Sequence, residues 1–212
     1  MKYQNIIFDL DGVICHTDAY HYQAWKALAD KLGIYFDEEI NNQLRGVSRM
    51  ESLNIVLRNY DGVMTDSEKA SYAEEKNNIY KELLKKMSPA DLSCEVKDTL
   101  CALREKGIKL AIGSSSKNAR FILERIGLGD FFDEISDGNN ISKSKPDPEV
   151  FLKAAQMLGA QPKECLVVED AVAGIQAAIA AGMDSAAIGD ATKSDLPTWK
   201  LGSFSDFLKI VE

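Results

Sequence analysis

Short apolar runs recur along the chain and predict buried strands. The first covers residues 5–8 and ends at acidic residues, and similar runs lie at 109–113, 166–170 and 185–189. Short runs without a polar face are typical of parallel strands, because helices cover both faces of such a sheet. The pattern therefore predicts at least four buried strands, the first with polar groups at its carboxyl end.

Helical patterns separate the later strands. Val96, Leu100 and Leu103 share one face of a predicted helix. The segments 147–159 and 171–181, each with a glycine at or just beyond its end, predict two more. Strands that alternate with helices of this length imply parallel βαβ units. We therefore expect an α/β core, a Rossmann-like doubly wound parallel sheet.

One long segment breaks this alternation. Between the first strand and Val96 no run predicts a strand, and helical stripes lie instead at 19–32, 50–59 and 67–87. A helical insert of this size is best interpreted as a second, all-α subdomain, here called the cap. The last dozen residues predict no element. The expected domains are a core of residues 1–15 and 89–212 and an inserted helical cap of residues 16–88.

Composition and charge exclude several classes of protein. The 212 residues are 45% hydrophobic and 27% charged, which is ordinary for a globular protein rather than a disordered or fibrous one. No apolar run approaches the ~18 residues of a membrane span. The N-terminus lacks the apolar stretch of a signal peptide. With 33 acidic against 25 basic residues, we expect neither nucleic-acid binding nor attachment to a membrane surface.

The four cysteines indicate the compartment. Cys15, Cys94, Cys101 and Cys165 are scattered, and none forms a CxxC pair. Their spacing favours free thiols in a reducing cytoplasm over disulfides or a zinc site. We expect a cytoplasmic monomer in which these cysteines are small, semi-buried side chains.

Candidate chemistry gathers where the predicted strands end. Asp9 and Asp11 follow the first strand, and alternation places both on one side of an extended backbone. A serine run with hydroxyl and N–H donors, Ser114 to Ser116, follows the second strand. Lys145 precedes a helix, and Glu169-Asp170 ends a later strand. Ligands of open α/β sheets bind at this carboxyl edge.

Each of these elements also has an ordinary structural interpretation. The aspartate pair can be an acidic turn, the serines a solvated loop, Lys145 a surface charge and Glu169-Asp170 a helix cap. Their joint placement at strand ends, in the order aspartates, serines, lysine and acidic pair, favours a common site. Carboxylates in such a cluster suit a hard cation held by oxygen ligands.

In this order the four elements resemble the motifs of the haloacid dehalogenase superfamily, and the resemblance spans nearly the whole chain. It implies phosphoryl transfer in which Asp9 is the nucleophile and forms an aspartyl phosphate. Asp11 would protonate the leaving oxygen and later deprotonate the acceptor. Lys145 and the Ser114 hydroxyl would bind phosphoryl oxygens. The implied cofactor is Mg²⁺, with a ligand set of Asp9, the Asp11 backbone carbonyl, Asp170 and, directly or through water, Glu169.

The insert is similar to that of the β-phosphoglucomutases within this superfamily. There a second phosphate, which is not being transferred, is held by residues that correspond to Arg49, Ser116, Lys117 and Asn118, and Ser115 joins the phosphate-binding set. Arg49 is the strongest candidate in the cap, because a guanidinium can bind phosphate with two hydrogen bonds. Further residues match positions that line the sugar or help the cap close: the hinge residue Thr17, His21, Trp25, Leu44, Gly46, Val47, Ser48, Ser52 and Lys76.

Two of these cap residues have alternatives, and two other positions depart from the family. Trp25 lies on an apolar helix stripe and is equally compatible with a place in the core. Lys76 lies in a charged helix and by itself indicates a solvated face. His16 stands before the hinge threonine where the family has aspartate, and Arg45 replaces a usual lysine. These departures bear on cap movement and on the substrate rather than on the reaction type.

The resemblance implies a β-phosphoglucomutase that acts on small-molecule sugar phosphates. It would convert β-D-glucose 1-phosphate to glucose 6-phosphate through β-D-glucose 1,6-bisphosphate. One alternative is a magnesium-dependent sugar-phosphate phosphatase, in which water attacks the aspartyl phosphate. Another is a non-catalytic phosphoacceptor module, which Asp11 and the large cap argue against.

Overall fold

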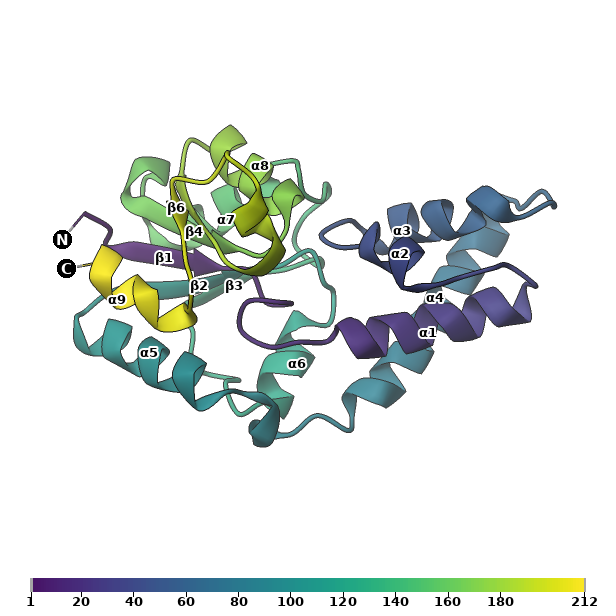
Figure 1. Ribbon diagram of the computed structural model, residues 1–212, viewed down its shortest axis with the longest axis horizontal. Coiled ribbons are helices and arrows are strands. Elements are labelled where there is room, and N and C mark those ends of the chain that lie inside the picture. Colours follow the sequence, from purple (N-terminus) through teal and green to yellow (C-terminus); the bar gives the residue numbers. More distant parts are fainter. Residues whose placement is uncertain (1, 212) are drawn as a thin grey trace.

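The computed structural model describes residues 2–211 and has a parallel sheet with a group of helices beside it (Figure 1). The strands are β1 (Asn5–Phe8), β2 (Lys109–Gly113), β3 (Glu134–Ser136), β4 (Cys165–Glu169), β5 (Asp184–Ala187) and β6 (Trp199–Lys200). The helices are α1 (Asp18–Lys31), α2 (Glu38–Asn42), α3 (Arg49–Val56), α4 (Asp66–Leu84), α5 (Cys94–Glu105), α6 (Ala119–Arg125), α7 (Glu149–Leu158), α8 (Val172–Ala180) and α9 (Phe207–Ile210).

The sheet has the doubly wound order expected from the sequence. Its strands are all parallel and follow the order β3-β2-β1-β4-β5-β6. From β1 the chain adds β2 and β3 on one side. It then crosses over to β4 on the other side of β1 and adds β5 and β6 beyond it. The carboxyl ends of β1 and β4 therefore flank the switch point, where ligands of such sheets bind.

Alternate residues of the central strands pack on opposite faces of the sheet. Ile6 and Phe8 join the cluster that includes Leu100 of α5 and Phe207 of α9. Ile7 faces the other way and joins the cluster formed with α7 and α8. Figure 1 shows these two helix pairs on opposite sides of the sheet. Because both faces are covered, continuous apolar runs can form strands here.

Helices α1 to α4 lie between β1 and β2 in the chain and form the group beside the sheet in Figure 1. They have an apolar cluster of their own that includes Trp25, Leu28, Leu53 and Val56. The far end of α4 behaves differently, because Tyr80 and Leu84 belong to the cluster beneath the sheet. The division into core and cap at residues 16 and 88 stays a prediction, and "cap" below means residues 16–88.

Several short elements were not predicted from the sequence. Strand β3 has three residues, α6 has seven and α9 has four, too few to show a clear period. The last dozen residues, which predicted no element, contain α9, whose buried Phe207 packs edge-on against Phe8. Two predicted strands are also displaced by one or two residues at their ends, to Cys165–Glu169 and Asp184–Ala187.

The four cysteines are free, as expected, but the prediction that they are semi-buried is wrong. Cys15 and Cys165 are buried, whereas Cys94 and Cys101 are exposed. Both exposed thiols are on α5, whose apolar stripe packs on the sheet, so they lie off that stripe and face solvent. Within residues 2–211 no helix is long and apolar enough to cross a membrane.

Candidate active site

The predicted catalytic residues converge at the carboxyl ends of three neighbouring strands. Asp9 directly follows β1, and its backbone N–H donates to the carbonyl of Val168 in β4 at 2.9 Å. Glu169 is the last residue of β4. Ser114 follows β2, and its N–H donates to Ser136 at the end of β3 at 3.0 Å. The hydrogen bonds of the sheet thus hold these side chains along one edge.

Lys145 is the buried cation at the centre of this edge. Its Nζ lies 2.6 Å from Oδ1 of Asp9 and 2.5 Å from Oε1 of Glu169, and its side chain is 1% exposed. Burial acts to lower the pKa of Lys145, but the charges of Asp9 and Glu169 outweigh it and raise that pKa above the ordinary value. The ammonium group therefore stays charged and can bind anionic oxygens.

Asp11 is held next to Asp9 as a carboxyl that can carry a proton. Thr17 donates a hydrogen bond to Oδ1 of Asp11, which fixes the side chain from behind. Burial of the carboxyl, together with the negative charge of Asp9, raises the pKa of Asp11 to about 7. A carboxyl with such a pKa can both donate and accept a proton near neutral pH.

Gly12 allows the chain to turn tightly after Asp11. Its φ angle is 87°, and its N–H donates to the carbonyl of Cys15 at 2.7 Å. A Cβ atom on residue 12 would lie 2.1 Å from Oδ2 of Asp170. Only glycine fits this close approach, so the turn after Asp11 and the carboxylate of Asp170 depend on each other.

Three carboxylates form a site that fits a divalent cation. Oxygen atoms of Asp9, Glu169 and Asp170 lie within 4.8 Å of one another, and all three residues are buried. Burial and the charges of Asp9 and Glu169 raise the pKa of Asp170 to about 8, and burial also raises that of Glu169. Such crowding of negative charge favours a hard cation with oxygen ligands. The predicted role of the Asp11 carbonyl as a further ligand stays a prediction.

The serine loop links the sheet edge to α6. The N–H of Ser116 donates to Oγ of Ser114 at 3.1 Å, and the N–H of Asn118 donates to Oγ of Ser116 at 3.2 Å. Ser114 is buried, whereas Lys117 is exposed. The hydroxyl of Ser115 lies 3.5 Å from the carbonyl of Gly46 in the cap. The loop is therefore ordered by its own hydroxyls and faces the cap.

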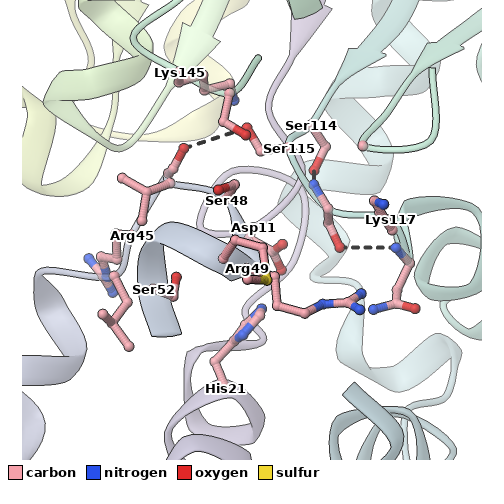
Figure 2. Close-up of a pocket in the computed structure, with 18 of the residues that line it drawn as sticks. Asp11, His21, Arg45, Ser48, Arg49, Ser52, Ser114, Ser115, Lys117 and Lys145 are labelled. Carbon is pink, nitrogen blue, oxygen red and sulfur yellow. Dashed lines mark hydrogen bonds between the residues drawn. The ribbon is translucent and has the colours of Figure 1, made fainter. Parts of the chain in front are cut away.

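A cavity of about 520 Å³ lies between this edge and the cap. Figure 2 shows that its wall combines side chains from both parts of the chain. Of the predicted site residues, only Thr17 is not part of the wall, and it contacts Asp11 from behind. The others all line the cavity: Asp9, Asp11, His21, Trp25, Leu44, Gly46, Val47, Ser48, Arg49, Ser52, Lys76, Ser114, Ser115, Ser116, Lys117, Asn118, Lys145, Glu169 and Asp170.

Lys76 lies in an aromatic pocket in the cap rather than on a solvated face. Its Nζ lies 2.9 Å from Nδ1 of His21, 4.7 Å from the ring centre of Trp25 and 4.6 Å from that of Tyr80. Burial lowers the pKa of Lys76 to about 7. The interpretation of Lys76 as a surface charge is therefore wrong. Trp25 is buried in the cap cluster and also lines the cavity, so its place in the core is confirmed and its predicted contact with the sugar stays a prediction.

Arg49 faces the cavity from the first turn of α3. The helix is capped by Ser48, whose Oγ accepts the N–H of Glu51 at 3.2 Å, and this fixes the base of the Arg49 side chain. Figure 2 shows that side chain extending toward the core loop that carries Lys117. Nη1 of Arg49 lies 3.1 Å from Oε2 of Glu74 on α4.

Several polar residues of this wall, among them Glu74 and Asn77, were not among the predicted site residues. Asn118 donates to the side-chain carbonyl of Asn77 at 3.0 Å, which joins core and cap. Asn77 and Glu74 lie three residues apart and so share one face of α4. In the sequence, this spacing on either side of Lys76 is the signal that could have indicated that Glu74 and Asn77 belong to the site.

Arg45 also connects the cap to the core. It pairs with Asp18 at the start of α1, and its Nη1 lies 3.3 Å from Asp190 and 3.9 Å from Asp170. The arginine that replaces the usual lysine therefore reaches three carboxylates at once, which the fork of a guanidinium allows. The effect of His16 on the hinge stays untested.

Comparisons with known proteins agree with this geometry. A model of the haloacid dehalogenase-like hydrolase family matches residues 3–182. A β-phosphoglucomutase of Bacillus subtilis is 42% identical over 87% of this chain and 82% of its own. A phosphorylated carbohydrates phosphatase of Thermotoga maritima is 30% identical over 84% of this chain and 82% of its own. A crystal structure of β-phosphoglucomutase from Clostridium difficile covers 99% of this chain and 96% of its own, at 38% identity with a TM-score of 0.93.

The chain therefore belongs to the haloacid dehalogenase-like hydrolase family and, within it, to the enzymes related to β-phosphoglucomutase.

A divalent cation should stabilise this protein more strongly as the pH rises. The folded-state pKa of Asp170, about 8, exceeds its unfolded value of about 4, so its contribution to stability is present below about pH 4 and is lost as the pH rises through 8. A cation needs the deprotonated carboxylate, so it offsets this loss. We expect saturating Mg²⁺ to raise the melting temperature more at about pH 8.5 than at about pH 6.

The matched variant is Asp170→Asn, which removes the carboxylate at nearly constant volume. This variant should reduce the Mg²⁺-dependent rise in melting temperature at both pH values. An equal shift at the two pH values, or an unchanged shift in Asp170→Asn, would contradict the proposed cation site.

Proposed function

We propose that this enzyme is a β-phosphoglucomutase that interconverts β-D-glucose 1-phosphate and glucose 6-phosphate through β-D-glucose 1,6-bisphosphate. The observation that carries the proposal is the second cationic region of the cavity. Figure 2 shows Arg49 of the cap extending toward the core loop that carries Lys117 and away from Lys145, which pairs with Asp9. Asn118 lines the same cavity. A phosphomonoesterase needs one phosphate site, whereas a mutase must hold a second phosphate during transfer of the first.

Asp9 would act as the nucleophile of both half-reactions. A carboxylate oxygen of Asp9 would form a bond to phosphorus while the bond between phosphorus and the substrate oxygen breaks. Lys145, hydrogen-bonded to Asp9, would stabilise charge on the phosphoryl oxygens together with the hydroxyl of Ser114. Asp9, Glu169 and Asp170 would hold Mg²⁺, which when bound screens the repulsion between the carboxylate and the phosphate.

Asp11 would move the proton that each transfer requires. When Asp9 accepts a phosphoryl group, the oxygen that leaves takes a proton from Asp11. When the aspartyl phosphate donates to a sugar hydroxyl, Asp11 takes that proton back. Its raised pKa, about 7, suits both directions, and the hydrogen bond from Thr17 orients the carboxyl.

The cap would exclude water while the bisphosphate is bound. Asn118 of the core contacts Asn77 of the cap, and Arg45 pairs with carboxylates on both sides of the cavity. A phosphate held between Arg49 and the core loop would add to these contacts and favour closure. The monomeric state and cytoplasmic location expected from the sequence stay predictions.

A sugar-phosphate phosphatase is the second candidate. Two relatives favour it: the phosphatase of Thermotoga maritima and a fructose-1-phosphate phosphatase of Escherichia coli, which is 32% identical over 87% of this chain. In that reaction water, rather than a sugar hydroxyl, would attack the aspartyl phosphate. The two functions differ in what accepts the phosphoryl group, so the acceptor decides between them.

Substitution of the two aspartates should separate their roles. Asp9→Asn should abolish the phosphoenzyme, because an amide is not a competent nucleophile. Asp11→Asn should keep substrate binding and slow transfer by about 10²–10⁴-fold, the usual effect of losing a general acid–base group. Rapid-quench mass spectrometry and turnover rates measure the two effects. A phosphoenzyme in Asp9→Asn, or an unchanged kcat in Asp11→Asn, would contradict these roles.

Arg49→Ala should change the acceptor of the phosphoryl group. Loss of the second phosphate contact should lower mutase kcat/KM by a factor that corresponds to about 2–4 kcal/mol of transition-state stabilisation. It should also let water compete for the aspartyl phosphate. Small phosphomonoesters without a second anionic group should be hydrolysed almost as before. The measurement is the ratio of mutase flux to phosphate release. An unchanged ratio would favour the phosphatase.

A further inference from the structure

We propose that Glu74 competes with the second phosphate of the substrate for Arg49 and so sets the affinity of that phosphate site. This inference rests on the proposed function, in which Arg49 holds the phosphate that is not being transferred. Glu74 would weaken the binding of that phosphate, so that the bisphosphate intermediate can release it and turn around between the two half-reactions.

The contact geometry shows which partner can give way. Oε2 of Glu74 lies 3.1 Å from Nη1 of Arg49. The side chain of Glu74 is 57% exposed, whereas that of Arg49 is 24% exposed and stands on the capped first turn of α3. Glu74 can therefore swing into solvent at small cost while Arg49 stays in the cavity wall. A phosphate oxygen can then take the position of the carboxylate on the guanidinium.

The same carboxylate belongs to a chain of hydrogen bonds across the cavity. Its Oε1 accepts from Nδ2 of Asn77 at 3.4 Å, and Oδ1 of Asn77 accepts from Nδ2 of Asn118 at 3.0 Å. These hydrogen bonds thus connect Arg49 through Glu74 and Asn77 to Asn118. The two ends of this chain of hydrogen bonds are proposed phosphate ligands, and Glu74 is the anion that pairs with the end in the cap.

The charge balance gives the direction of the effect. Arg49 and Lys117 contribute two positive charges to this part of the wall, and Glu74 contributes a negative charge next to one of them. A phosphate that binds here must displace that carboxylate and remain near it, which costs part of the attraction to Arg49. Binding that is equally tight in every state of the cycle does not raise kcat. A moderate affinity of this site for phosphate therefore suits a bisphosphate intermediate that must be released and turned around between the two half-reactions.

Binding of β-D-glucose 1,6-bisphosphate tests the proposal directly. We would measure its dissociation constant by isothermal titration calorimetry with saturating Mg²⁺ in an Asp9→Asn background, where no phosphoryl transfer occurs. Glu74→Gln should bind the bisphosphate about 1.5- to fivefold more tightly, the effect expected for an exposed charge pair. This difference should shrink when the salt concentration is raised.

The neighbouring residue supplies a matched control. Glu75 carries the same charge on the same helix, but it pairs with Lys31 at 2.7 Å and does not line the cavity. Glu75→Gln should therefore leave the dissociation constant unchanged, which separates a local effect from one of net charge.

A third variant distinguishes failure of this inference from failure of the proposed function. If Arg49→Ala weakens bisphosphate binding but Glu74→Gln behaves like Glu75→Gln or binds more weakly than the parent, Glu74 does not compete and the inference is overturned. If Arg49→Ala leaves binding unchanged, Arg49 does not hold the second phosphate, and the proposed function, which rests on that contact, fails with it. Tighter binding by Glu74→Gln alone, lost at high salt, supports the proposal.

Discussion

The buried ammonium of Lys145 between Asp9 and Glu169 is the interaction on which the site depends. Four acidic side chains, Asp9, Asp11, Glu169 and Asp170, converge at one sheet edge, where burial raises the pKa of three of them. A buried charge without a partner costs far more than a paired one. Lys145 supplies one compensating charge, and the oxygen cluster of Asp9, Glu169 and Asp170 fits a cation that supplies the rest.

This concentration of negative charge at the sheet edge also explains the basic residues of the cap. Arg45, Arg49 and Lys76 all line the same cavity, and none of them is fully solvated. Arg45 is paired with carboxylates of cap and core, and Lys76 is held over aromatic rings. Within residues 2–211, the acidic partner of Arg49 is the exposed Glu74. Of these three cations, Arg49 is thus the one whose partner an anionic ligand can most readily replace.

Much of this arrangement could be predicted from the sequence, because it depends on local patterns. Continuous apolar runs identify buried parallel strands, and the residues directly after them must lie at one edge. The short elements could not be predicted, since β3 and α9 owe their conformation to tertiary packing, such as Phe207 on Phe8. Tyr80 lies one turn after Lys76 on α4, so that contact is local. The contact of Lys76 with Trp25 and the pairing of Glu74 with Arg49 each join two helices, so neither has a local signal.

The central claim is that a sugar hydroxyl, not water, accepts the phosphoryl group from Asp9. Phosphorus NMR of β-D-glucose 1-phosphate with the enzyme, Mg²⁺ and a catalytic amount of β-D-glucose 1,6-bisphosphate tests it most directly. The account predicts that the substrate signal is replaced by that of glucose 6-phosphate, with little inorganic phosphate. Accumulation of inorganic phosphate in step with loss of substrate would contradict it.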